Sequence, residues 1–139
     1  MECKYNVGID ANTINIQVNV GTAATCYTSV YQAGQTTLKA ESTKTSNGTI
    51  VKTSLGNAAV LKNIQLIIKT VVDFSALPNE IIEAIKADHN LIKTYVTIKY
   101  IFDGGFDGIQ NFGYDMEDCA VSSTGRMAEV VKQIDFVTQ

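Results

Sequence analysis

The pattern that most constrains this 139-residue chain is a pair of alternating segments, residues 61–74 and 92–102. In both segments large apolar residues share one face of an alternating pattern and mostly polar residues share the other, with Tyr95 and Ile101 as exceptions in the second segment, which is typical of half-buried β-strands. The apolar faces are Ile64, Leu66, Ile68, Val72 and Phe74 in the first segment, and Ile92, Val96, Ile98, Tyr100 and Phe102 in the second. Two such strands predict the apolar wall of a sheet, whether they pair with each other or with separate neighbours.

The residues between these segments predict a helix over about 78–88. Pro78 has no amide N–H to donate within a sheet, and its fixed φ suits the first turn of a helix. Four apolar residues then recur at helical spacing and share one face, which indicates a helix packed against the sheet. These residues are Leu77, Ile81, Ile82 and Ile85.

Most of the remaining chain also predicts strands. Residues 14–20 alternate apolar and amide side chains, and residues 25–32 resume a strand after a Gly-Thr break. The C-terminal residues 126–137 have an apolar spacing that suits both a helix and a strand; we favour the strand, because the Thr124-Gly125 turn before them suggests a hairpin. We therefore expect one mainly β domain over residues 1–139, an antiparallel β-sandwich or barrel-like domain with one short inserted α-helix.

A second local signal is Asn47-Gly48, which lies between two β-prone runs rich in Thr, Ser and Lys. Asn-Gly favours a hairpin turn, because both residues readily adopt positive φ. The flanking runs carry few large apolar groups, so we expect a hairpin over about 36–54 that protrudes from the domain. In an assembly this hairpin would contact a neighbouring subunit through residues near its tip. These residues are Thr45, Asn47, Gly48 and Thr49.

Residues 103–118 are rich in both glycine and acidic side chains, which predicts an exposed loop. Asp103, Asp107 and Asp115 are candidate calcium ligands, because Ca²⁺ prefers carboxylate oxygens, although their spacing does not match an EF-hand loop. The alternative is a solvated acidic loop whose apolar residues pack back onto the core. These residues are Phe106, Ile109, Phe112 and Tyr114.

The composition narrows the range of possible functions further. A net charge of −3 without a cluster of Lys or Arg argues against sequence-specific binding of nucleic acid. Only 18% of residues are charged, which suits a subunit packed among other subunits. The three cysteines, Cys3, Cys26 and Cys119, are far apart and indicate neither a disulfide framework nor a zinc site. The N-terminal residues lack a signal-peptide pattern and no segment has the length of a membrane span, so we expect cytoplasmic synthesis and no membrane partner.

Catalytic motifs do not emerge from the sequence. The chain has one histidine, His89, which follows the expected helix and which we interpret as a capping or surface residue. The sequence lacks a nucleophile elbow, a phosphate-binding loop and a dinucleotide fingerprint. We therefore expect a protein that is not an enzyme and needs no cofactor.

In architecture and composition the whole chain resembles the small β-sandwich structural proteins of tailed-phage virions and phage-like contractile particles, whose tube subunits also carry one helix among their strands. The resemblance implies a structural subunit that forms homo-oligomers, contacts other subunits of the same particle and resides in the assembled virion. The alternative is a small module that binds a carbohydrate or a peptide through exposed aromatic residues. The candidates for that role are Tyr27, Tyr31, Phe106 and Tyr114.

Overall fold

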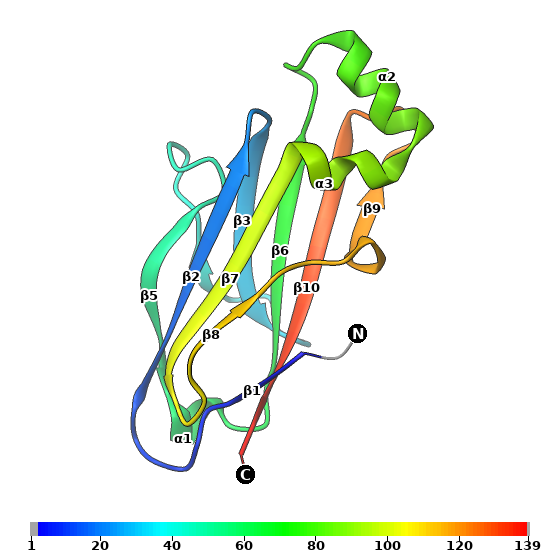
Figure 1. Ribbon diagram of the computed structural model, residues 1–139. Helices are drawn as coiled ribbons and strands as arrows, with labels where there is room; N and C mark the ends of the chain where they lie inside the picture. Colours follow the sequence, from blue (N-terminus) through cyan, green and yellow to red (C-terminus); the bar gives the residue numbers. More distant parts are fainter. Residues whose placement is uncertain (1–2, 139) are drawn as a thin grey trace.

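The computed structural model describes residues 3–138 and shows two β-sheets packed face to face (Figure 1), so the expected β-sandwich is confirmed. The first sheet has the order β1 (Lys4–Asn6), β10 (Met127–Val137), β6 (Gln65–Asp73), β3 (Thr25–Gln32) and β4 (Leu38–Glu41). β9 (Cys119–Val121) pairs with the same edge of β10 as β1 does, at the other end of that strand. The second sheet has the order β5 (Ile50–Asn57), β2 (Thr13–Thr22), β7 (Val96–Gly105) and β8 (Gly108–Phe112).

The core lies between the two sheets and is built by the alternation seen in the sequence. In β2 the side chains of Ile14, Ile16 and Val18 point inward and are fully buried, while the amides between them face outward. β6, β7 and β10 repeat this arrangement, and two further aromatic rings pack around that of Phe102. Phe102 lies 5.5 Å from the ring of Tyr5 and 5.6 Å from the ring of Phe136 between centroids.

The two alternating segments lie in different sheets, because β6 belongs to the first and β7 to the second. The chain crosses between them through α2 (Asn79–Ala87), η1 (His89–Leu91) and α3 (Ile92–Tyr95), at the upper end of the sandwich in Figure 1. The expected helix is thus confirmed, with Ile82 and Ile85 buried beneath it. The expected strand over 92–102 begins four residues later, because residues 92–95 form a helical turn that still buries Ile92.

Residues 36–54 do not form the expected hairpin. β4 pairs with β3 in the first sheet and β5 pairs with β2 in the second, so this segment crosses between the sheets. Asn47 and Gly48 do adopt positive φ, 51° and 92°, but the carboxamide of Asn47 accepts a hydrogen bond from the Cys26 N–H at 2.7 Å and donates one to the Ala24 carbonyl at 2.8 Å. These bonds fix the turn against the start of β3 instead of letting it protrude.

Residues 103–112 form a hairpin rather than a loop, since β7 continues to Gly105 and pairs with β8. The side chains of Phe106 and Ile109 do not pack back onto the core; they are 76% and 72% exposed. The space beneath the turn is already occupied by Tyr5, whose hydroxyl donates to the Gly108 carbonyl at 2.6 Å and accepts from the Gly105 N–H at 2.9 Å.

The remaining expectations for this region and the C-terminus hold. Tyr114 is buried, and Phe112 packs edge-on against Phe102 with 5.9 Å between ring centroids. The C-terminal segment is the strand β10, which forms an antiparallel hairpin with β9. Two short helical turns, α1 (Ala58–Leu61) and η2 (Met116–Asp118), complete the chain that the structure describes.

Candidate functional site

Large apolar side chains gather in solvent at one end of the sandwich, which we call the apolar end. Four side chains form it, each more than two-thirds exposed: Ile9, Val60, Phe106 and Ile109. Ile9 lies in the loop between β1 and β2, Val60 in α1, Phe106 in the turn between β7 and β8, and Ile109 in β8. These elements share the lower end of the molecule in Figure 1, opposite α2.

Backbone contacts hold the elements of the apolar end together. The Asn6 N–H donates to the Asp107 carboxylate at 2.9 Å, and the Asp107 N–H donates to the Asn6 carbonyl at 3.2 Å, which ties the β1–β2 loop to the turn. Gly8, with φ of 80°, approaches Phe106 so closely that a Cβ there would lie 3.3 Å from the Phe106 Cβ. The Ala58 N–H donates to the Asn12 carbonyl at 2.8 Å and joins α1 to the same loop.

The three candidate calcium ligands do not come together. Asp103 forms an ion pair with Lys52 at 3.1 Å and accepts from the Asn15 side chain at 2.8 Å, and the pKa of Asp103 is lowered, mainly by that hydrogen bond. Asp107 is engaged by Asn6 at the turn, and Asp115 lies in the cap of η2. Within residues 3–138, no group of three or more His, Cys, Asp or Glu side chains is placed to hold a metal ion.

The four expected interface residues do not form one exposed surface. Thr45 is exposed, but the hydroxyl of Thr49 accepts from the Val20 N–H at 3.2 Å, and Gly48 is buried against Cys26. The polar atoms of Asn47 are used inside the domain, as described above. This turn is therefore a weaker candidate for an interface than the apolar end.

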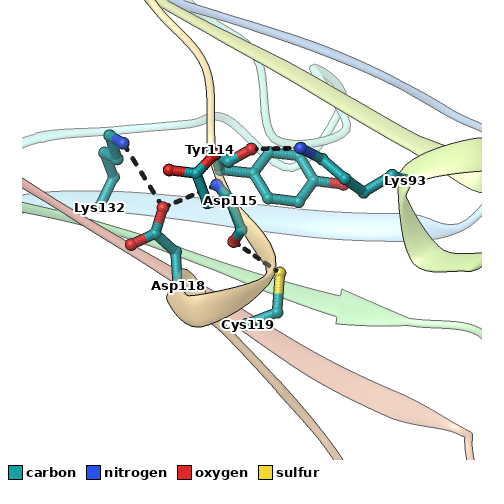
Figure 2. Close-up of polar contacts among 6 residues, drawn as sticks. All are labelled: Lys93, Tyr114, Asp115, Asp118, Cys119 and Lys132. Atoms are coloured by element: carbon teal, nitrogen blue, oxygen red, sulfur yellow. Dashed lines mark hydrogen bonds and ion pairs between the residues drawn. The ribbon is translucent and has the colours of Figure 1, made fainter. Parts of the chain in front are cut away.

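A polar cluster lies where the chain from β8 to β9 meets β10 (Figure 2). Lys132 is only 3% exposed, and its ammonium group lies 3.4 Å from a carboxylate oxygen of Asp118. The same oxygen accepts from the Asp115 N–H at 2.9 Å, which closes the capping box of η2. Nearby, the ammonium group of Lys93 donates to the Tyr114 carbonyl at 2.6 Å and lies 5.0 Å from the centre of its ring.

The electrostatics of this cluster indicate a structural role. Burial lowers the pKa of Lys132, but its contacts with Cys3 and Asp118 outweigh burial, so the pKa is raised overall and the lysine stays charged. Burial raises the pKa of Cys119 to about 11, which keeps this thiol protonated and unreactive at neutral pH. Burial also raises the pKa of Tyr100, whose hydroxyl finds no hydrogen-bond partner within residues 3–138. The cluster therefore anchors residues 113–121 on β10 and presents no activated nucleophile.

Two further features bear on function: the histidine of the sequence and the hydropathy of the helices. His89 is exposed in η1 and lies outside the polar cluster shown in Figure 2. None of the helices within residues 3–138 has the length and hydropathy needed to cross a membrane.

Comparison with known proteins gives no relative for this chain. No family model matches it, and no curated protein or solved structure matches it significantly.

The sequence reasoning missed two members of the apolar end, Ile9 and Val60. Ile9 lies between Gly8 and Asp10, in a stretch with no strand periodicity. No predicted strand or helix would therefore bury this large apolar side chain. That isolation was the available signal. Val60 gave none, because its neighbours Ala59 and Leu61 are also apolar.

Proposed function

We propose that this chain is a non-enzymatic structural subunit of a large homo-oligomeric assembly, of the kind formed in tailed-phage virions or phage-like contractile particles. It acts through its surfaces, alongside other structural subunits of the same particle, after synthesis in the cytoplasm. The observation that carries the proposal is the apolar end, where four apolar side chains remain in solvent on elements that contact one another.

The physical reason is the free energy of apolar burial. Covering one side chain the size of isoleucine or phenylalanine contributes about 1.5–3 kcal/mol. Single exposed apolar residues are common on protein surfaces, but a group rimmed by polar residues marks an interaction site. Asp10 and Asp107 provide such a rim here, next to Ile9 and Phe106.

The alternative, a module that binds a carbohydrate or a peptide, has less support. Tyr114 is buried and unavailable for stacking. Tyr27 and Phe106 are exposed, but Tyr27 lies on β3 of the first sheet and Phe106 at the tip of the second, so they offer no shared platform. Tyr27 is also held by a 2.7 Å hydrogen bond to Glu41.

The proposal is tested by measuring the mass of the purified protein by light scattering over a concentration series and imaging the same samples by negative-stain microscopy. We expect rings, tubes or other discrete high oligomers. The double variant Ile9→Ser with Phe106→Ser should shift the distribution toward monomer. Val51→Ser is the matched control, because Val51 is 75% exposed on β5 and is not one of the four residues of the apolar end. A wild-type protein that stays monomeric at every concentration would refute the proposal.

A further inference from the structure

The strand β8 forms an edge of the second sheet and lies open to solvent. It pairs with β7 on one side only, and four of its five residues are exposed. The outward backbone N–H and C=O groups of an edge strand form a template for another strand. Proteins usually protect such edges with charged residues, proline, bulges or very short strands.

The other open edges of the described chain carry such protection, whereas the strand β8 itself does not: the one register shift in its pairing with β7 places the extra residue on β7. β4 has only four residues and includes Lys39 and Glu41. β5 contains Lys52, and its pairing with β2 is interrupted by two register shifts. β1 and β9 have three residues each. By contrast β8 has the sequence Gly-Ile-Gln-Asn-Phe, with no charged residue and no proline.

The absence of charge matters most for pairing with an identical strand. In an antiparallel pair related by a two-fold axis, residues near the centre lie opposite or beside their own copies. Like charges directly opposite one another destabilise a sheet, so a strand with Lys or Glu near its centre opposes its own copy. Gln110 is the middle residue of β8, is exposed, and can face a second glutamine without repulsion.

We propose that β8 pairs antiparallel with β8 of a second copy of this chain about a two-fold axis near Gln110. The two four-stranded sheets then become one continuous sheet. Exposed Ile109 lies in the contact, and Phe106 lies at its rim in the preceding turn. This inference rests on the proposed function and identifies one contact of the assembly. A two-fold contact alone ends at a dimer, so growth to a larger particle requires a second contact.

The test uses charge at the centre of the strand. Gln110→Lys and Gln110→Glu are purified separately, and self-association is measured by light scattering for each variant and for an equal mixture. Each variant alone should associate about fivefold more weakly than wild type, because like charges face each other, and the mixture should regain the wild-type association. Gln35→Lys and Gln35→Glu, at an exposed glutamine outside the strands, serve as controls that should show neither effect.

Hydrogen exchange gives an independent readout. The amides of residues 108–112 that point away from β7 should exchange more slowly as protein concentration rises. Association that is unaffected by either Gln110 variant, with unchanged exchange in β8, overturns this inference and leaves the structural-subunit proposal in place. Charge-dependent association that stops at a dimer supports the β8 contact and contradicts a large assembly. A protein that is monomeric at all concentrations contradicts both.

Discussion

Two glycine-containing turns in this protein differ in how closely they are held against the domain. The turn at Asn47-Gly48 is rich in polar residues, yet it is fixed against the domain by the hydrogen bonds of Asn47 to Cys26 and Ala24, and Gly48 is buried. The turn between β7 and β8 carries a phenylalanine, yet Phe106 is 76% exposed. The polarity of a turn thus does not decide whether it is buried.

What decides it is whether the turn satisfies polar groups that would otherwise be unpaired. The carboxamide of Asn47 provides a donor and an acceptor to the backbone at the start of β3, which lies at the seam between the sheets. A buried backbone group without a partner costs about 1–3 kcal/mol, so a side chain that supplies one is drawn inward. At the other turn, the hydroxyl of Tyr5 already supplies both bonds, and Phe106 has no space left to fill.

The largest expected effect comes from Gly48→Ala. Gly48 has φ of 92°, and a Cβ there would lie 2.8 Å from the Cys26 Cβ. Backbone strain and steric overlap together should lower the free energy of unfolding by about 3 kcal/mol. Gly108→Ala is the matched control: its φ is 68°, but no atom lies within 4 Å of the added Cβ, so only strain remains, about 1 kcal/mol. Urea unfolding followed by far-UV circular dichroism measures both. If both variants lower the free energy of unfolding equally, an added Cβ meets no more obstruction at Gly48 than at Gly108.

Asn47→Ala should cost about 2 kcal/mol, because it removes both hydrogen bonds and places at a φ of 51° an alanine, which adopts positive φ less readily than asparagine. Asn111→Ala, an exposed amide in β8, is the control and should change the free energy of unfolding by less than about 0.5 kcal/mol. The same urea titrations apply. If Asn47→Ala lowers the free energy of unfolding as little as Asn111→Ala does, the hydrogen bonds of Asn47 are not what holds residues 43–49 in place.

A smaller effect concerns pH, because Cys26 lies beneath the packed turn. Burial raises the pKa of this thiol from 9.0 to about 11 in the folded protein. Above pH 9 the unfolded chain therefore loses this proton first, the folded state holds more protons, and stability falls as pH rises toward 11. Between pH 8 and 10 the loss from Cys26 should be about 1 kcal/mol.

Cys26→Ala isolates this contribution, since the variant keeps the other groups that titrate in the same range. The difference in the free energy of unfolding between wild type and variant should shrink by that amount from pH 8 to pH 10. A difference that stays constant would show that the thiol titrates as it does in water and that the turn does not seal it from solvent.

Much of the fold was predictable because it depends on local periodicity. The alternation in β2, β6 and β7, the helix after Pro78 and the strand assignment of residues 126–137 all hold in the structure. The partners of these strands were not predictable, because period-2 patterns show which face is buried and not which strand lies beside it. For the same reason Asn47-Gly48 correctly predicted a tight turn but not the crossing between sheets.

The candidate site was harder to predict than the fold. Asp103, Asp107 and Asp115 are close in sequence, but each carboxylate is used by a different local partner: Lys52 and Asn15, Asn6, and the cap of η2. The apolar end joins residues nearly 100 positions apart, through Gly8 and Phe106. Only the tertiary structure brings such residues together, so no short sequence pattern could have shown that they share one end of the sandwich.

The smallest expected change in stability comes from Phe106→Ala. Phe106 is exposed and fills no cavity, so its removal should alter the free energy of unfolding of the monomer by less than about 0.5 kcal/mol. Phe112→Ala, in the same hairpin, is the matched control and should cost about 2 kcal/mol, because it removes a half-buried ring that packs on Phe102.

At the apolar end, Phe106 should matter more for self-association than for the stability of the monomer. Phe106→Ala should weaken self-association in light scattering while leaving the unfolding transition in place, since its ring contributes only where another molecule covers it. A loss of stability in the monomer would mean that Phe106 packs within its own domain, as the sequence suggested. No change in either measurement would mean that the exposure of this ring serves no contact, and the contrast between the two turns would then be one of local packing alone.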